Sequence, residues 1–320
     1  MKVFVAGASG ALGRALVPQL VTRGHHVVGM TRSASKQDLV RSLGARPVVA
    51  DALDPDAVAQ AVASAEPEVI VHQLTALSGK LSMRDARHPE RSSMANMTNR
   101  LRTEATDHLL AAGRGAGVRR FVAQSFTAFR WARTSGPVLT EAEPIDPDPP
   151  AALSAALVGI LHVERAVPAI EWGEGLVLRY GGFYGPGTAI SRAPDAPMAV
   201  PIRKRMFPII GDGGGVWSHV HIDDAASATV TAVDHGQPGI YNVVDDEPAP
   251  VREWLPALAS ALDAKPPRRI PRWLGRLAAG ETATLMMTDS RGASNEKAKR
   301  ELGWQLRYPS WRQGFAQGLG

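Results

Sequence analysis

The sequence predicts an α/β protein built on a doubly wound parallel sheet, with a smaller and more irregular C-terminal portion. Three features of the 320-residue chain predict this fold: a glycine-rich turn near its start, apolar strand-like runs that alternate with helical patterns through its first half, and loops with scattered Gly and Pro after about residue 180. Continuous apolar strands that alternate with helices are typical of a parallel sheet covered by helices on both faces.

The first element is an apolar strand, Lys2–Ala6, which leads directly into a glycine-rich turn. Gly7 permits the turn, Gly10 lets the backbone approach a phosphate, and Gly13 lets the following helix pack closely on the strand. A strand, a tight turn and a helix N-terminus form the arrangement that holds the pyrophosphate of a dinucleotide. The residues of this turn that we expect to contact the cofactor are Gly7, Ser9, Gly10, Ala11, Leu12 and Gly13.

The same alternation predicts the later elements in order. The expected strands are Lys2–Ala6, His26–Met30, Arg46–Ala50, Glu68–His72, Arg120–Gln124 and Gly175–Tyr180. The expected helices are Gly13–Arg23, Ser35–Leu43, Asp54–Ala63, Ser93–Ala116 and Ala151–Val167. The proline-rich segment from Pro144 to Pro150 is expected to be a rigid connection before the last of these helices.

The change of texture near residue 180 predicts two parts. We expect a dinucleotide-binding, Rossmann-like domain over residues 1–180 and a substrate-binding portion over residues 181–320. Val216–Ile222 and Ile240–Val244 still have the character of strands and could return to the main sheet, so the boundary is soft.

Composition narrows the classes of partner. The formal net charge is +5, but the densest basic cluster, Lys265–Arg276, is interrupted by prolines and is expected to be a solvated loop, so we expect no nucleic-acid partner. The chain has no cysteine, which excludes disulfides and thiolate metal sites. No apolar run is long enough to cross a bilayer, and the early first strand leaves no room for a signal peptide. We therefore expect a soluble, cytoplasmic protein without a membrane partner.

These motifs and several later ones together give the chain a family resemblance. The later segments are Asp51-Ala52-Leu53-Asp54, Gln73-Leu74-Thr75-Ala76, Arg120–Ser125, Leu178–Gly187, His219–Asp224 and Leu302-Gly303-Trp304. In their order and spacing, the chain resembles the extended short-chain dehydrogenase/reductase superfamily, the NAD-dependent epimerase/dehydratase group, over nearly its whole length.

The resemblance implies where the rest of the cofactor binds. The loop with Asp51 and Ala52 would contact the adenine, residues 73–75 would line the ribose and nicotinamide, and the backbone of Gly182 and Phe183 would approach the carboxamide. These implied contacts are Asp51, Ala52, Gln73, Leu74, Thr75, Gly182 and Phe183. For Asp51 and Asp54 the competing interpretation is helix capping, because Asp is a favoured N-cap residue.

The end of the second strand predicts NADP(H) in preference to NAD(H). Thr31 stands where an NAD-specific protein usually carries an acidic residue that binds the ribose diol. Arg32 supplies a charge and donors suited to a 2′-phosphate, with Ser33 and Lys36 assisting. The alternative is that Arg32 is an ordinary exposed surface arginine.

The resemblance fails at the usual acid/base pair. In this superfamily a tyrosine and, four residues later, a lysine face the nicotinamide from one helix, and the lysine lowers the phenol pKa for proton exchange with the substrate. The matching helix, which contains Glu164, has Ala156 and Ile160 at these places. No shift of register restores the pair, because the first tyrosine is Tyr180 and residues 81–203 contain no lysine.

Two hydroxyls at the end of the fifth strand are candidates for substrate contact, because ligands lie at the carboxyl edge of such a sheet. Ser125 is the first choice and Thr127 the second. Ser125→Ala is expected to depress turnover strongly and leave NADP(H) affinity nearly unchanged, because one transition-state hydrogen bond is worth about 2–4 kcal/mol. Alternatively, Ser125 only completes the strand end. Tyr184 is a third catalytic candidate, but packing is the competing interpretation for Tyr184 and Tyr180.

Histidines near residue 220 raise the question of a metal. His219 and His221 lie two residues apart and would share one face of a strand. Asp223 and Asp224 after them are more readily explained as caps of the next helix, so no metal site is expected.

Three functions remain in competition. The leading one is an NADP(H)-dependent oxidoreductase that acts on a small organic carbonyl or hydroxyl substrate with a non-standard acid/base. The second is an epimerase, dehydratase or cyclase that uses the cofactor transiently or structurally. The third is a non-catalytic dinucleotide-binding sensor or scaffold.

A homodimer is also expected from the resemblance. A four-helix interface would form through the helices Ser93–Ala116 and Ala151–Val167. The apolar residues offered for this interface are Leu101, Leu109, Leu153, Leu157 and Leu161, and they could instead serve the core of one chain.

Overall fold

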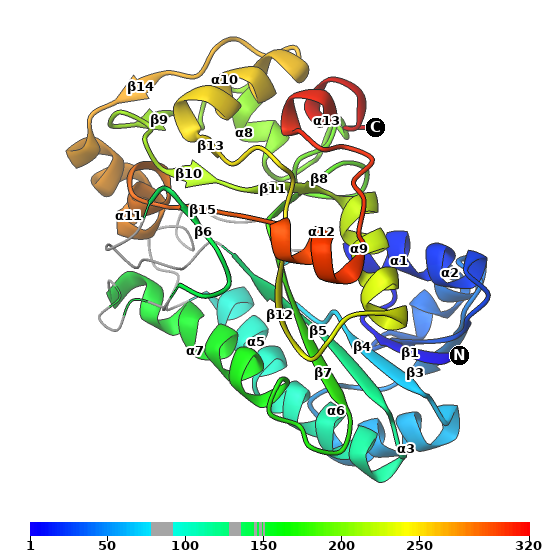
Figure 1. Ribbon diagram of the computed structural model, residues 1–320. Helices are drawn as coiled ribbons and strands as arrows, with labels where there is room; N and C mark the ends of the chain where they lie inside the picture. The colour runs from blue at the N-terminus through cyan, green and yellow to red at the C-terminus, as the bar shows by residue number, and fades with distance from the viewer. Residues whose placement is uncertain (78–91, 128–135, 144–145, 147–148, 150) are drawn as a thin grey trace.

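The computed structural model contains a seven-stranded, wholly parallel sheet in the order β12-β7-β5-β4-β1-β2-β3 (Figure 1). It describes residues 1–320 except 78–91, 128–135, 144–145, 147–148 and 150. The strands are β1 (Lys2–Ala6), β2 (His26–Thr31), β3 (Arg46–Val49), β4 (Val69–His72), β5 (Arg120–Phe126), β7 (Glu174–Tyr180) and β12 (Gly239–Val243). The doubly wound α/β fold predicted from the sequence is confirmed.

Helices cover both faces of this sheet. One face carries α1 (Ala11–Thr22), α2 (Gln37–Ser42), α9 (Ile222–Asp234) and α12 (Glu296–Leu302). The other carries α3 (Pro55–Ala65), α5 (Ser93–Arg102), α6 (Glu104–Gly115) and α7 (Ala151–Ala166). Strand β1 shows how the sequence encodes both layers, since Val3 and Val5 pack under α1 while Phe4 and Ala6 pack in the opposite core.

The C-terminal portion caps one end of the sheet (Figure 1) and has a core of its own. Its strands are the two- and three-residue elements β8 (Gly182–Tyr184), β9 (Ile209–Ile210), β10 (Val216–Trp217), β11 (His219–His221), β13 (Ala249–Pro250), β14 (Arg269–Ile270) and β15 (Gly292–Ala293), the last paired with β6 (Val138–Leu139). Its helices are α8 (Ala199–Arg203), α10 (Val251–Ala261), α11 (Arg272–Thr288) and α13 (Trp311–Gln317). In the N-terminal half, a short 3-10 helix, η1 (Ala34–Lys36), precedes α2.

Several elements differ from the prediction. The single helix expected over Ser93–Ala116 is two helices, because Thr103 departs from helical geometry at φ −99° and ψ −79°. The basic segment expected to be a solvated loop is exposed but ordered, since β14 pairs with β9 and α11 begins at Arg272. Most of the proline-rich connection at 144–150 lies outside the described residues.

Two further predictions concern local detail. Asp54 caps α3 through Oδ1, which accepts hydrogen bonds from the backbone N–H of Asp56 and Ala57 at 3.0 and 3.1 Å. Ile240–Val244 lies in the main sheet as β12, whereas the strands near residues 216–221 pair outside it. Among the described helices, none has the length and apolar character needed to span a membrane.

Candidate active site

The glycine turn after β1 leaves no room for larger residues. Gly7 has φ +99°, and a Cβ there would stand 2.9 Å from the carbonyl oxygen of Gln73. A Cβ on Gly13 would stand 2.4 Å from the carbonyl oxygen of Gly7. Both glycines are therefore required to bring the turn against the end of β4 and the start of α1.

Helix α1 presents an uncapped N-terminus. Gly10 is its N-cap and provides no side-chain hydrogen bond, and the first turn contains no acidic residue. The first backbone N–H groups, from Ala11, Leu12 and Gly13, lack helical acceptors by geometry. Donors at a helix N-terminus favour an anion, so this turn fits the pyrophosphate of a dinucleotide.

The end of β2 is built from hydroxyls and one free charge. Thr31 is buried, and its Oγ1 lies 3.2 Å from Ser9 Oγ and accepts a 3.4 Å hydrogen bond from the Ser33 backbone N–H. Arg32 is exposed, and no residue of the described part of the chain forms an ion pair with it. The geometry thus leaves a guanidinium beside Ser33 and the start of η1.

In the loop after β3, the Asp51 carboxylate accepts a hydrogen bond from the backbone of the same loop. Asp51 is exposed, and its Oδ1 accepts a 3.0 Å hydrogen bond from the Leu53 backbone N–H. Ala52 is buried, and His108 Nδ1 lies 3.0 Å from its carbonyl oxygen. Asp51 therefore shapes the turn and still presents a carboxylate oxygen to solvent.

The loop after β4 is held on two sides. Gln73 donates from Nε2 to the hydroxyl of Tyr180 at 3.3 Å, while its buried Oε1 has no hydrogen-bond partner among the described residues. The carbonyl of Leu74 accepts a 3.0 Å hydrogen bond from Gln124 Nε2. Thr75 is half-buried between these fixed points. An unpaired buried amide oxygen at this edge is an acceptor available to a ligand.

Strand β8 brings its backbone to the same end of the sheet. Gly182 donates its N–H to the carbonyl of Ser218 at 2.9 Å, and Phe183 packs its ring 5.3 Å from that of Tyr180. Gly182 and Phe183 are both half-buried. The predicted cofactor residues therefore come from β1, β2, β3, β4 and β8 of one connected region.

Ser125 does not point a free hydroxyl at this region. Its Oγ donates to Glu164 Oε1 at 2.9 Å, and Glu164 also forms a bidentate ion pair with Arg179 at 2.5 Å through each oxygen. All three side chains are buried. Since its hydrogen bond completes a buried ion pair, the geometry favours the structural interpretation of Ser125 over a substrate contact.

Thr127 is better placed for a ligand. Its backbone N–H donates to the carbonyl of Tyr180 at 3.0 Å, which fixes the residue just beyond β5. Among the described residues, none hydrogen-bonds its hydroxyl. The structure thereby reverses the order of preference between the two hydroxyls.

The tyrosines pack. Tyr184 is fully buried against the rings of His221 and Phe315, each 5.2 Å away, and burial raises the pKa of its phenol. Gly314 makes room for it, since a Cβ there would lie 2.0 Å from the Tyr184 hydroxyl. Tyr180 is buried, and its hydroxyl is bound to Thr229 at 2.7 Å. Neither phenol is positioned as an acid/base, and the packing interpretation is favoured for both.

Helix α7 presents apolar residues where the acid/base pair would stand. Ala156 is half-buried and Ile160 is buried. Of the five leucines offered for a dimer, Leu109, Leu153 and Leu157 are buried within the chain and the other two pack against the same clusters. The core interpretation is therefore favoured for these three leucines, whereas Leu101 and Leu161 are half-buried and the dimer stays a prediction.

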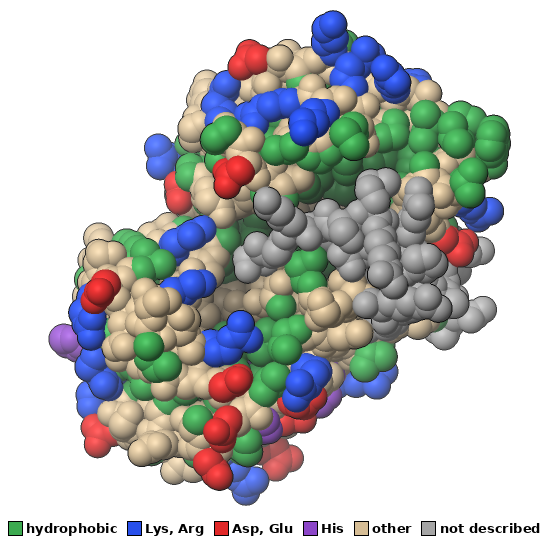
Figure 2. Space-filling model, turned by 180° about the vertical axis from the view of Figure 1, so that it is seen from behind, with side chains coloured by type: hydrophobic (Ala, Val, Ile, Leu, Met, Phe, Trp, Pro, Cys, Tyr) green, Lys and Arg blue, Asp and Glu red, His purple; other side chains and the backbone are tan. Residues whose placement is uncertain are grey.

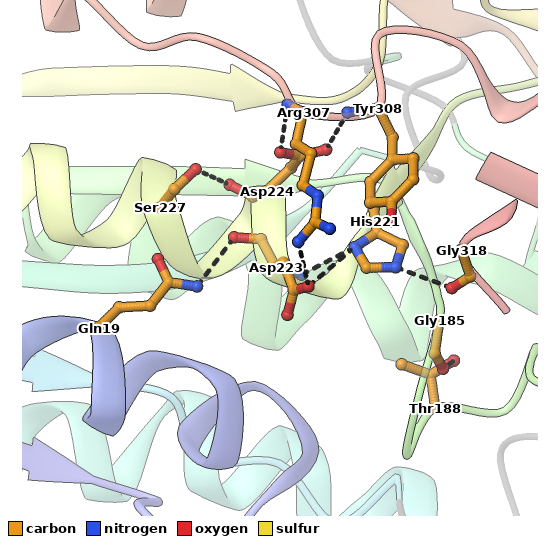
Figure 3. Close-up of polar contacts among 10 residues, drawn as sticks. All are labelled: Gln19, Gly185, Thr188, His221, Asp223, Asp224, Ser227, Arg307, Tyr308 and Gly318. Atoms are coloured by element: carbon orange, nitrogen blue, oxygen red, sulfur yellow. Dashed lines mark hydrogen bonds and ion pairs between the residues drawn. The ribbon is translucent and has the colours of Figure 1, made fainter. Parts of the chain in front are cut away.

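Of the two histidines near residue 220, His219 is buried in β11, and His221 joins the start of α9 to the C-terminal segment (Figure 3). His221 accepts a hydrogen bond from the Asp223 N–H at its Nδ1 and so caps α9, and its Nε2 lies 2.8 Å from the carbonyl of Gly318. Asp224 accepts the backbone N–H groups of Arg307 and Tyr308, so it anchors the C-terminal segment rather than capping the helix. Within the described residues, no cluster suited to a metal occurs.

Sequence reasoning missed one group beside the site. Arg102, at the end of α5, is a buried arginine near Glu164. Nothing in its local pattern distinguishes it from the exposed Arg100 of the same helix, because burial follows from the packing of α5 on α7. The face of the molecule between the two portions is hollowed, and apolar side chains line part of the hollow (Figure 2).

Comparisons with known proteins agree with this architecture. Residues 3–243 match the model of the NAD dependent epimerase/dehydratase family. The chain is 45% identical over 318 residues to a 3-diazoavenalumate denitrifying reductase from a Streptomyces species, covering 99% of this chain and 100% of that protein. It is 29% identical to a 2-alkyl-3-oxoalkanoate reductase of Stenotrophomonas maltophilia, covering 82% and 76% of the two chains.

Solved structures show the same fold. A UDP-glucose 4-epimerase from Thermotoga maritima, determined with UDP-glucose, aligns with a TM-score of 0.74 at 20% identity and covers 100% of this chain and 97% of that one. MoeE5 in complex with UDP-glucuronic acid and NAD aligns with a TM-score of 0.72 at 21% identity, covering 100% and 98% of the two chains.

Proposed function

This chain belongs to the NAD dependent epimerase/dehydratase family, and we propose that it is an NADP(H)-dependent reductase that removes the diazo group of an aryl diazonium substrate. Support comes from the similarity over the full length, at 45% identity, to a reductase named for the denitrification of a diazo compound. An aryl rather than an alkyl diazonium is proposed because alkyl diazonium ions lose dinitrogen spontaneously in water.

The apolar face of α7 is the observation that carries the proposal. Reduction of a carbonyl places charge on oxygen, which a nearby acid must neutralise. Ala156 and Ile160 cannot supply that proton. A diazonium ion is already cationic and its reduction leaves no alkoxide, so a site without the acid/base pair suits it. When bound, NADPH supplies a hydride, and the balanced reaction is aryl diazonium plus NADPH giving arene, dinitrogen and NADP⁺.

This chain's residues would bind and orient the reactants. The uncapped start of α1 would hold the pyrophosphate, and the unpaired Oε1 of Gln73 would accept a hydrogen bond from the ribose or the carboxamide. Thr127 would orient the substrate at the end of β5. The apolar side chains that line part of the hollow would limit competing attack by water.

NADP(H) is proposed over NAD(H) from the end of β2. Thr31 is neutral and turned inward, so no carboxylate there repels a 2′-phosphate. Arg32 is exposed beside the Ser33 and Ser35 hydroxyls, which lie 2.7 Å apart. Planar, bidentate guanidinium donors match phosphate geometry, so this corner is suited to the additional charge.

Carbonyl reduction is the second candidate, because Thr127 has no hydrogen-bond partner for its hydroxyl among the described residues and could orient a ketone. Relatives at 26–29% identity include a ketoreductase of Stigmatella aurantiaca and the oxoalkanoate reductase. A homodimer through α5, α6 and α7 is also proposed, and Val158, which is 61% exposed on α7, offers it an apolar contact.

The test is a substrate panel with NADPH oxidation followed by absorbance and headspace gas followed by mass spectrometry. We expect 4-carboxybenzenediazonium to yield benzoate and one dinitrogen per NADPH consumed. Oxidation with ketones alone would support the second candidate. Product without net oxidation would support an epimerase, dehydratase or cyclase. Inertness with every substrate, despite cofactor binding, would support a sensor or scaffold.

A further inference from the structure

Arg102 is a buried arginine at the junction of α5 and α6. It is the last residue of α5, and only 7% of its surface is exposed. Its stem lies along α7, because a Cβ on Gly159 would stand 3.1 Å from Arg102 Cβ and 3.3 Å from its Cδ. The lack of a side chain at Gly159 therefore admits the stem of the arginine against α7.

The guanidinium has no partner within the described part of the chain. Its Nε makes no hydrogen bond, and none of the described carboxylates forms an ion pair with it. Burial lowers the pKa of Arg102 to about 10, with the charge of Glu164 acting in the opposite direction, so the group is still protonated at neutral pH. A buried cation without a partner is strongly unfavourable.

The nearest acid is already used. Glu164 binds Arg179 through both oxygens and accepts the hydroxyl of Ser125, and it forms no ion pair with Arg102. His72 is the other titratable neighbour, and burial lowers its pKa to about 4, which leaves it neutral. Among the described residues, two guanidinium groups therefore share the influence of one carboxylate, which leaves one positive charge of this buried cluster uncompensated.

This charge lies beside the proposed site rather than beside the cofactor phosphates. Thr98, one turn before Arg102, accepts the backbone N–H of Ala76 at 3.2 Å, which joins α5 to the loop after β4. The proposed pyrophosphate and 2′-phosphate contacts lie across the sheet, at the ends of β1 and β2. The cofactor's own charges are thus accounted for elsewhere.

We propose that Arg102 binds an anionic oxygen of the substrate, a carboxylate or a phenolate, and so selects anionic aromatic substrates. This rests on the proposed function, which places the substrate next to α7 at the end of β5. A guanidinium forms short, charge-assisted and bidentate hydrogen bonds to such oxygens. Binding would supply the buried cation with a counter-charge that the described residues do not provide.

The test is a binding assay that requires no turnover, so it remains informative if the diazonium reaction fails. The carboxylate pair of probes is 4-hydroxycinnamate and its methyl ester, and the phenolate pair is 4-nitrophenolate and 4-nitroanisole. Dissociation constants are measured by calorimetry with saturating NADP⁺ for the wild type, Arg102→Met and Arg102→Lys. Arg100→Met is the matched control, because Arg100 is exposed on the same helix and paired with Glu104.

In one of the two probe pairs, the carboxylate or the phenolate pair, we expect the wild type to bind the anion about 10- to 100-fold more tightly than its neutral analogue. Arg102→Met should abolish that preference without weakening the neutral analogue, Arg102→Lys should keep part of it, and Arg100→Met should keep all of it. The free Arg102→Met protein should melt at or above the wild-type temperature, because an unpaired buried charge is removed. A lower melting temperature, equal binding of anions and neutral analogues by the wild type, or preference retained in Arg102→Met would each overturn the proposal.

Discussion

The two ends of the site, at the same edge of one sheet, differ in how much of the family pattern they keep. At β1 and β2 the glycine turn, the uncapped helix start and the free arginine are all present. At β5, β7 and α7 the tyrosine and lysine are absent, Ser125 is bound to a buried ion pair, and an unpaired arginine lies beside the apolar helix.

This difference indicates which part of the chemistry the protein retains. Cofactor binding depends on backbone geometry that admits almost no substitution. Proton donation depends on particular side chains, here the absent tyrosine and lysine. A protein can do without them when its substrate does not require a proton. A reaction limited by positioning and by hydride transfer is therefore compatible with both ends.

The largest expected effect is at the cofactor end, from Gly13→Ala. The new Cβ would lie 2.4 Å from the carbonyl oxygen of Gly7 and 2.5 Å from that of Ala8, so the turn must open. We expect NADPH affinity to fall by at least ~100-fold, measured by quenching of tryptophan fluorescence. Gly115→Ala is the control, because a Cβ there meets nothing within 4 Å. Normal affinity in Gly13→Ala would mean that the cofactor does not use this turn.

At the catalytic end, substitutions of the buried Glu164 and Ser125 should first lower the free energy of unfolding. Glu164→Gln leaves Arg179 buried without its carboxylate, and breaking a buried pair in this way costs about 3–5 kcal/mol. Ser125→Ala removes one hydrogen bond to the same carboxylate and should cost about 1 kcal/mol. Urea unfolding of both variants measures the two losses. If Ser125→Ala stopped turnover with stability intact, the original assignment of Ser125 as a catalytic group would be restored.

His72 lies at the end of β4, between the cofactor end and the catalytic end, and its burial leads us to expect that the protein loses stability in acid. Burial lowers its pKa from 6.5 to about 4 in the folded protein, so the unfolded chain binds more protons between these values. Stability is complete above the unfolded pKa and falls as the pH drops toward 4, by on the order of 3 kcal/mol from this group. Unfolding free energies from pH 7 to 4 should show this slope, and His72→Gln should flatten it. An unchanged slope in the variant would assign acid sensitivity to other groups.

Arg32 tests the cofactor end more finely. Arg32→Ala should weaken NADPH by about 10- to 100-fold and leave NADH nearly unchanged, because only the 2′-phosphate loses a charge-assisted contact. Fluorescence titration with both cofactors measures the ratio. Arg41→Ala is the control, since Arg41 is exposed nearby but already paired with Asp38. Equal losses for the two cofactors would refute the preference for NADP(H).

The sequence predicted the glycine turn between β1 and α1 better than the surroundings of Ser125, for a physical reason. Gly7 and Gly13 act through local backbone geometry, which spacing alone reveals, and the buried strands are continuous apolar runs that can be recognised locally. The hydrogen bonding of Ser125 depends on two distant residues. Glu164 is 39 residues further along the chain, and Arg179 lies on another strand, β7. The burial of Arg102 depends on Gly159 across a helix pair, and no local pattern encodes that contact.

The kink at Thr103 illustrates the same limit. The helical pattern is continuous through Ser93–Ala116, so the sequence predicts one helix. In the structure Thr103 Oγ1 donates to the carbonyl of Asn99 at 3.0 Å, and the backbone turns there. The turn allows α5 to pack on α7 and α6 to pack on α3, a tertiary requirement that overrides local propensity.

The smallest expected effect concerns the missing phenol itself, which can be restored at Ala156. A bulky residue there could hinder the substrate whatever its chemistry, so Ala156→Tyr is compared with Ala156→Phe, which has the same ring without the hydroxyl. If the reaction needs no proton donor, the two variants should reduce an aryl diazonium at rates within about twofold of each other, because the phenol stabilises no developing charge. With a ketone the phenol should help by about 100-fold or more, since general acid catalysis then acts on the forming alkoxide. The measurement is the Tyr-to-Phe ratio of kcat/KM for each substrate. A ratio near 100 with the diazonium would show that its reduction does require a proton, and the apolar face of α7 would then no longer support denitrifying reduction over carbonyl chemistry.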